Sequence, residues 1–167
     1  NLRAINKIMA YSRLAISSFD VRSQLPFDLV FLLCYIKLTN NAVYAAIKNH
    51  EYSIQALVDK LEAILPPSLF VEKGYEGYPR SAAWAIAHLL LAYNYPTRGI
   101  AIEPDFDGIP IDDSKFLSFP IQTTKLKLEL LLEALTYCRQ GQDRYFMEGL
   151  NHILSRIDLT ENISLDY

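Results

Sequence analysis

The sequence predicts an all-α fold, a mainly helical, bundle-like domain with a small β-prone hairpin or loop insertion near residues 97–119. Apolar residues recur at three- and four-residue steps through most of the chain, which is the period of an amphipathic helix. Of the 167 residues, 51% are hydrophobic and 21% are charged, values that suit one globular domain with a core of useful size. Prolines and a few glycines separate the periodic segments into about seven helices.

The first predicted helix covers the start of the chain and runs for about five turns. Its apolar stripe, with Ser12 in register, consists of Leu2, Ile5, Met9, Ile16 and Phe19. Arg3 and Lys7 lie four residues apart on the flank of the same helix. The periodic pattern fades over 18–24, so we expect the helix to end there.

Three more helices are predicted at 27–38, 42–48 and 52–64. The first of these follows Pro26 and is apolar on almost every side, which is typical of a central helix covered by its neighbours. Residues 39–41 can cap the second helix, and the Pro-Pro pair at 66–67 ends the third.

Residues 66–80 are rich in proline and glycine and form the best internal boundary, which divides the chain into 1–65 and 66–167. Apolar and aromatic residues are interspersed in this connector, so we expect it to pack down and to leave one compact unit. Beyond it, helices are predicted at 81–95, from Pro120 to Gly141, and at 146–157. We expect a loose tail from Asp158 onward.

The chain lacks the common motifs that activate a nucleophile, a phosphate or a metal. It has only 6 glycines and contains no Walker-type P-loop, Gly-x-Gly-x-x-Gly, Gly-x-Ser-x-Gly, His-Glu-x-x-His or Cys-x-x-Cys. We therefore predict no catalytic residue and no metal ligand in this chain. Cys34 and Cys138 each lie in an apolar helical pattern, which is typical of buried reduced thiols in a cytoplasmic protein.

Net charge and hydropathy argue against nucleic acid and membranes as partners. The formal net charge of −3 is too mild to indicate a nucleic-acid footprint or attraction to an acidic membrane surface. The longest strictly apolar run covers only 29–36, whereas a membrane span needs roughly 20 such residues.

Two groups of titratable residues could carry chemistry. His88 lies on an apolar helix face, where a hydrogen-bonded core histidine is commoner than a catalytic or metal-binding one. The 103–113 loop carries a cluster of acidic residues, namely Glu103, Asp105, Asp107, Asp112 and Asp113. It resembles the first part of a calcium loop but lacks the later ligands, so a solvated acidic loop is the simpler interpretation, with glycosidase-like paired carboxylates as the alternative.

Several of the 11 tyrosines stand beside glycines and prolines in predicted loops or at helix ends. Tyrosine buries a large area while keeping a polar tip, so such clusters are common at interfaces. We take four of them as a candidate interaction surface: Tyr75, Tyr78, Tyr93 and Tyr95. The alternative is that these rings cover the ends of helices.

The first 65 residues carry three short motifs in a fixed order. The run Asn1-Leu-Arg3-Ala-Ile5-Asn-Lys7 is followed by the apolar run Phe31-Leu-Leu-Cys-Tyr-Ile-Lys37 and by an Asn-x-x-x-Tyr segment at 40–44. Residues 1–65 thereby resemble the helical region that follows the nucleotide-binding core of KAP-family P-loop NTPases.

This resemblance implies that the chain is a piece of a larger, often bacterial, ATP-hydrolysing protein, and we also expect a piece because Asn1 directly precedes a helical stripe. ATP and magnesium would be bound by a missing P-loop core, so no cofactor is expected in this chain. Only Arg3 matches a position that could sense the nucleotide. Residues 66–167 have no counterpart in the family and would be an elaboration for partner recognition.

We therefore predict a non-catalytic regulatory or interaction module that works beside a P-loop core in cis or with another protein, and we leave assembly into an oligomer open. One alternative is a self-sufficient enzyme that uses the 103–113 loop with His88 or Tyr75. Another is a nucleic-acid-binding helical module that uses Arg3, Lys7 and Arg13, whose binding would weaken steeply with salt.

Overall fold

The structure, a computed structural model, describes residues 2–19, 26–70, 74–75, 78–79, 82–94, 121–142 and 149–160. These residues form seven α-helices, one 3-10 turn and two short strands. The elements are α1 (Leu2–Ser17), α2 (Phe27–Thr39), α3 (Asn41–Lys48), α4 (Ile54–Ile64), η1 (Pro67–Leu69), β1 (Gly74–Tyr75), β2 (Tyr78–Pro79), α5 (Ala83–Asn94), α7 (Leu128–Gln142) and α8 (Leu150–Leu159). The predicted all-α class is confirmed for this part of the chain, and the β-prone insertion near 97–119 lies outside it.

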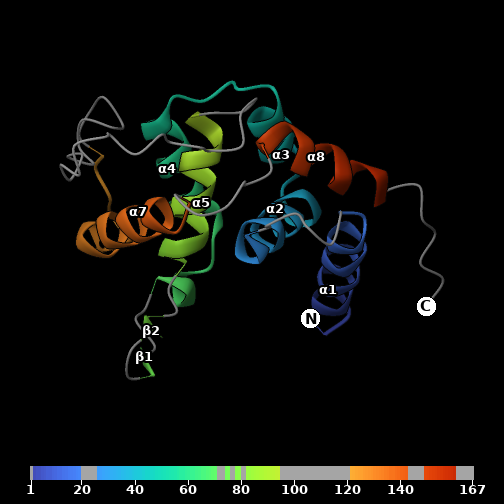
Figure 1. The fold of residues 1–167 in the computed structure, drawn as a ribbon, viewed down its shortest axis with the longest axis horizontal. Coiled ribbons are helices and arrows are strands. Elements are labelled where there is room, and N and C mark those ends of the chain that lie inside the picture. The colour runs from blue at the N-terminus through green and yellow to red at the C-terminus, as the bar shows by residue number, and fades with distance from the viewer. Residues whose placement is uncertain are drawn as a thin grey trace.

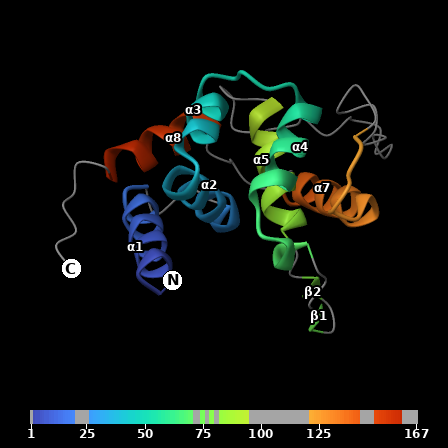
Figure 2. The ribbon, with the colours of Figure 1, turned by 180° about the vertical axis from the view of Figure 1, so that it is seen from behind.

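The helices are arranged around α5 (Figure 1). Helix α7 crosses one side of α5, α4 lies beside it, and α2 packs against it on the side away from α7. Helices α1 and α8 lie beyond α2, so that the chain begins at the end of the molecule opposite α7 (Figures 1 and 2). The centre of the bundle is therefore the α2–α5 contact, and α1 lies at its edge.

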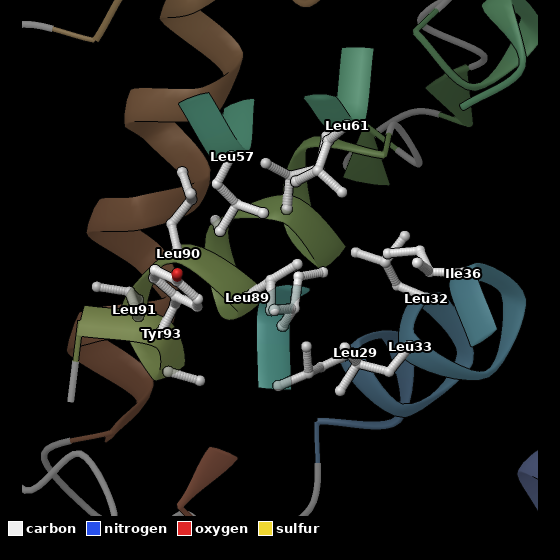
Figure 3. Packing of buried hydrophobic residues seen from close by; sticks show 14 of the residues in the cluster. Leu29, Leu32, Leu33, Ile36, Leu57, Leu61, Leu89, Leu90, Leu91 and Tyr93 are labelled. Carbon is white, nitrogen blue, oxygen red and sulfur yellow. The ribbon is translucent and has the colours of Figure 1, made fainter. Parts of the chain in front are cut away.

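One hydrophobic core connects these helices. Figure 3 shows side chains from α2, α4 and α5 meeting there, and the labelled ones are Leu29, Leu32, Leu33, Ile36, Leu57, Leu61, Leu89, Leu90, Leu91 and Tyr93. Helix α2 is apolar on almost every side, and seven of its residues are buried, as expected of a central helix. The same core includes Leu131 and Leu135 of α7 and Ile153 of α8, which come from the far side of the predicted boundary at 66–80.

Polar side chains and backbone geometry fix several helix ends. The Asn40 and Ser53 side chains accept hydrogen bonds from backbone N–H groups of α3 and α4 respectively, and so cap the two helices. Helix α3 ends at Lys48, and His50, two residues further on, has a φ of 55° in the left-handed region. The N–H of Glu51 then returns to the carbonyl of Ala46. His50 thus marks the boundary between α3 and the segment that leads to α4.

The connector after α4 is only partly extended. Its first residues form η1, and Phe70 is buried in the core, which agrees with the prediction that this segment packs down. Strands β1 and β2 then pair antiparallel, with Gly74 opposite Pro79 and Tyr75 opposite Tyr78. This strand pair lies beyond η1, away from the helices (Figure 1).

Two predictions about the C-terminal half were wrong. The helix expected from Pro120 starts only at Leu128, because Glu62 of α4 holds the preceding residues in a non-helical conformation. Asp158, expected to begin a loose tail, lies in the last turn of α8 and is bound by side chains of α2 and α3.

Candidate functional site

The strongest polar cluster fastens α8 to α2 and α3. A carboxylate oxygen of Asp158 lies 2.8 Å from the Lys37 ammonium and accepts a 2.9 Å hydrogen bond from the Tyr44 hydroxyl. Lys48 pairs with the other carboxylate oxygen. The Lys37 ammonium also lies 5.1 Å from the centre of the Tyr44 ring, within the range of a cation–π contact.

Burial and hydrogen bonding shift the pKa of the Asp158 carboxyl in opposite directions. Burial on its own would raise the pKa of Asp158, but the bonds from Lys37, Lys48 and Tyr44 outweigh it and lower the pKa. The Lys37 side chain is only 7% exposed, so Asp158 stabilises a charge that is largely removed from water. The cluster is a structural clamp in which each oxygen of the carboxylate already accepts a bond from a partner.

A second carboxylate holds the segment that precedes α7. Glu62 of α4 accepts backbone hydrogen bonds from Thr124, Lys125 and Leu126, at 2.9, 2.9 and 2.8 Å, and a 2.6 Å bond from the Thr124 hydroxyl. The Lys125 ammonium in turn donates to the Glu62 carbonyl. Burial opposes the charged form, yet these donors lower the pKa of Glu62. Glu62 thereby fixes 124–126 in a turn and delays the start of the helix.

The closest approach to a catalytic arrangement lies between α2 and α5. The Nδ1 atom of His88 is 2.7 Å from one oxygen of Asp28, whose other oxygen accepts the N–H of Leu29. This pair resembles the base and orienting acid of a catalytic triad. The expectation that His88 is a hydrogen-bonded histidine on a core-facing helix is confirmed, because its side chain is mostly buried and carries this bond.

Neither cysteine, both of which lie in the part of the chain that the structure describes, is an activated nucleophile for that pair. Burial, and then the nearby charge of Asp28, raise the pKa of the Cys138 thiol. Burial also raises the pKa of Cys34, although a hydrogen bond with Ser12 and the charge of Lys37 act the other way. Both cysteines are free and buried, as predicted, and their protonated thiols are poorly suited to nucleophilic attack.

Of the four tyrosines predicted to form an interaction surface, the structure describes one side chain. Tyr93 is buried, its hydroxyl bonds both the N–H and the carbonyl of Tyr52, and its ring stacks on His50 at 4.4 Å between centroids. This geometry corrects the prediction at Tyr93 and matches the alternative of a ring that covers helix ends.

The other predicted positions are placed less fully. The backbones of Tyr75 and Tyr78 form the β1–β2 pair, whereas Tyr95 and the acidic loop at 103–113 lie outside the described residues. Among the side chains that are described, no three His, Cys, Asp or Glu residues gather as they would to hold a metal ion. None of the described helices is both long and apolar enough to cross a bilayer.

A different surface emerges on α1. Its N-terminal half presents large apolar side chains to solvent: Leu2 is 75% exposed, Ile5 55% and Met9 45%. Further along the same sequence pattern, Ser12 of α1 and Phe19, which lies just past the end of the helix, are buried. Large apolar residues exposed in a row are a stronger sign of an interaction site than scattered ones.

Arg3, the predicted nucleotide sensor, is also exposed on α1. It lies one helical turn from Lys7, whose ammonium is 5.7 Å from the centre of the Tyr11 ring. The predicted basic flank therefore exists as a face of α1, separate in rotation from the apolar stripe. The structure brings no other predicted site residue to this face among those it describes.

Comparison of the chain with protein-family models, with curated proteins and with solved structures finds no match. The likeness of residues 1–65 to the KAP family therefore rests on the motif residues alone. The geometry defines an all-α domain whose polar clusters bind its own helices together and whose first helix has an exposed apolar stripe.

Proposed function

We propose that the chain is a non-catalytic interaction module and that its binding surface is the N-terminal half of α1. The observation that carries this proposal is the exposure of Leu2, Ile5 and Met9 in one row of a well-formed helix. Leaving such side chains in water forgoes about 1.5–3 kcal/mol for each one that could be buried. A partner that covers them would recover this free energy.

The internal use of the chemically active groups supports the same proposal. The carboxylates of Asp158 and Glu62 each accept several bonds from the chain itself, and His88 is paired with Asp28. Bonded in this way, the two carboxylates stabilise the fold and have lowered pKa values that make them weak bases, and both free cysteines have raised pKa values, so neither is an activated partner for His88.

The resemblance to KAP-family NTPases gives this proposal a finer form, in which the neighbour of α1 is a P-loop core and Arg3 reaches its nucleotide. In that case ATP and magnesium belong to the core. The chain by itself should show no ATP binding in calorimetry, because the sequence contains no Walker-type loop to hold phosphates. A Walker-type loop encoded ahead of Asn1 would support this form, and its absence there would remove it.

Site-specific photo-cross-linking in the cells that produce the chain tests the general proposal. A photoreactive residue at Ile5 should give one discrete adduct, which should disappear when Leu2 and Met9 are both replaced by serine. Lys60, exposed on α4, is the matched control position and should give no such adduct. The same adducts from both positions, or none from Ile5, would refute α1 as the binding surface.

A further inference from the structure

We propose that residues 161–167, the tail that follows α8, fold back along α1 and cover its exposed apolar stripe within the same chain. The stripe consists of Leu2, Ile5 and Met9. The inference rests on the proposed function, because the tail and a partner would compete for this one surface. It follows from the place where α8 ends, from the apolar pattern of the tail, and from the match in spacing between the tail and α1.

Helix α8 ends next to α1, so the tail begins close to the stripe. The two helices pack against each other, and the ring of Phe19, just past the end of α1, lies 5.5 Å from the ring of His152 in α8. Figures 1 and 2 show the last turn of α8 beside the C-terminal end of α1. Thr160, the last residue that the structure describes, is buried, which fixes the point from which the tail departs.

The sequence of the tail alternates between apolar and polar residues. Apolar side chains occupy every second position, namely Ile163, Leu165 and Tyr167, and the positions between them carry asparagine, serine and aspartate. In an extended chain, residues two apart face the same side, so the tail has one apolar and one polar side. In a helix, by contrast, Leu165 would face away from the other two. The pattern indicates an extended segment that lies with one side on an apolar surface and the other in water.

The spacing of the tail fits that of the stripe. Side chains on one side of an extended chain recur about every 6.6 Å, and helix residues four apart are separated by about 6 Å along the axis. From Met9 toward the start of α1, Ile5 is four residues away and Leu2 a further three. A tail that runs antiparallel to α1 therefore places its three apolar residues opposite these three, in order. The apolar residues span about 13 Å in the tail and about 10 Å along α1, a difference that side chains of this length can absorb.

The same alignment pairs opposite charges. Glu161 comes two residues before Ile163, and the exposed Arg13 lies one helical turn beyond Met9, on the same side of α1. Placing Ile163 opposite Met9 therefore brings Glu161 next to Arg13. Because α1 contains no acidic residue, the alignment brings no carboxylate of the tail against another carboxylate. The segment of this chain that starts nearest to the stripe thus matches it in both apolar spacing and charge.

A cover of this size lowers the access of a partner without abolishing it. A short connection gives the tail and the stripe an effective concentration on the order of 1 mM. If the tail binds the stripe with a dissociation constant of about 0.1 mM, it covers the stripe about nine-tenths of the time, and a partner binds about tenfold more weakly. Three apolar contacts and one exposed ion pair suit an interaction of this modest strength. The tail would therefore regulate the proposed binding surface.

Photo-cross-linking of the purified 167-residue chain tests the fold-back directly. A photoreactive residue at Ile5 should form a cross-link to residues 161–167, which mass spectrometry of the digested chain identifies. A mixture of isotopically heavy and light chains shows whether the link forms within one chain, since links between two copies join heavy and light peptides. Absence of a link to the tail, or links between copies only, would overturn the inference.

Variants of the tail test the apolar contact without altering α1. Ile163→Ser combined with Leu165→Ser should make peroxide oxidise Met9 at least about threefold faster, because the stripe is then uncovered for more of the time. Asn162→Ala combined with Ser164→Ala is the matched control, since these positions face away from α1 in the proposed alignment and should leave the rate unchanged. Equal rates in the wild type and the serine variant, or the same acceleration in the control, would overturn the inference. Circular dichroism checks that both variants remain folded.

Cross-linking in cells separates this inference from the proposed function. With the photoreactive residue at Ile5, the serine variant of the tail should give several-fold more partner adduct than the chain with an unchanged tail. If both chains give the same amount of adduct and the purified chain shows no link to its tail, the proposed function stands and the fold-back is wrong. If the purified chain links to its tail and neither chain gives an adduct in cells, the fold-back stands and the partner surface is refuted.

Discussion

Replacing Glu62 by glutamine removes one charge without changing the size of the side chain, and we expect it to destabilise the fold. The carboxylate serves three backbone donors and one hydroxyl, and it is only 3% exposed. Thr124 and Lys125 are exposed, so water can accept hydrogen bonds from their N–H groups in place of the carboxylate. Leu126 is buried, so its N–H group has no such replacement. A buried donor left without a good acceptor costs about 1–3 kcal/mol, and we expect about 2 kcal/mol in total because glutamine keeps one acceptor oxygen.

Urea unfolding followed by circular dichroism measures this change. With a slope of about 2 kcal/mol per molar urea, the midpoint should fall by about 1 M. Glu133→Gln is the matched control, because Glu133 is exposed on α7, and it should change stability by less than about 0.5 kcal/mol. Equal midpoints for the Glu62 variant and the wild type would show that the carboxylate does not hold residues 124–126.

The same variant carries a pH signature. The pKa of Glu62 is lower in the folded chain than its ordinary value of 4.5, so its stabilising effect is complete above that value and disappears as the pH falls through the folded pKa. The difference in unfolding free energy between wild type and variant should therefore shrink below about pH 4.5. A difference that stays constant between pH 7 and pH 3 would contradict the electrostatic explanation.

Three further predictions concern other parts of the fold. Asp158→Asn should lower the unfolding free energy by about 3 kcal/mol in urea, because it removes the charge of a carboxylate that pairs with the buried Lys37 ammonium. Lys37→Met in the same chain should restore part of the loss. His50→Gly should relieve about 1 kcal/mol of strain from the left-handed backbone, but it removes the ring stack on Tyr93 and the 3.1 Å hydrogen bond to the Tyr93 carbonyl. The net loss of stability in thermal unfolding should be about 1 kcal/mol, and a more stable variant would show that backbone strain dominates. A thiol-labelling reagent that contains an aromatic disulfide should react slowly with both cysteines in the folded chain and fast in denaturant, since burial raises the pKa of both thiols. Fast labelling of the folded chain would contradict that burial.

Local signals were sufficient for the helices between residues 27 and 94. The predicted ranges 27–38, 42–48, 52–64 and 81–95 differ from α2, α3, α4 and α5 by no more than two residues at either end. Pro26, Asn40 and Ser53 precede α2, α3 and α4, and each one favours a helix start in the residues directly after it. Where a helix end is set by a neighbouring residue, the sequence predicts it well.

The start of α7 could not be found in this way. Proline at 120 and buried apolar residues at 121 and 126 continue a helix-like pattern, but the backbone there bonds to a carboxylate more than sixty residues earlier in the chain. The relevant sequence signal is in α4, where Glu62 interrupts the apolar face formed by Val58, Leu61 and Leu65. A charged residue in such a face needs several polar partners, although the sequence does not say which ones.

Asp158 is a similar case of a charged residue whose position indicates a distant partner. A carboxylate in the last turn of a helix is unfavourable with the helix dipole, so its presence there indicates a compensating cation elsewhere. Lys37, the single cation on a helix that is apolar on almost every side, was the complementary signal. Each residue was visible in the sequence, but only the packing of α8 against α2 and α3 shows that they are partners.

The apolar stripe of α1 shows where periodicity stops being informative. Leu2, Ile5 and Met9 satisfy the same pattern as Ile16 and Phe19, and the sequence predicted one continuous helix face without saying where its cover ends. The structure divides that face, because the neighbours of α1 cover its C-terminal half and leave the rest at the edge of the molecule. If the stripe served only the domain's own core, polar residues at positions 2, 5 and 9 would keep the helix and its contacts. Their apolar character in a solvent-exposed half-helix is therefore the feature that the fold alone does not explain and on which the proposed interaction surface rests.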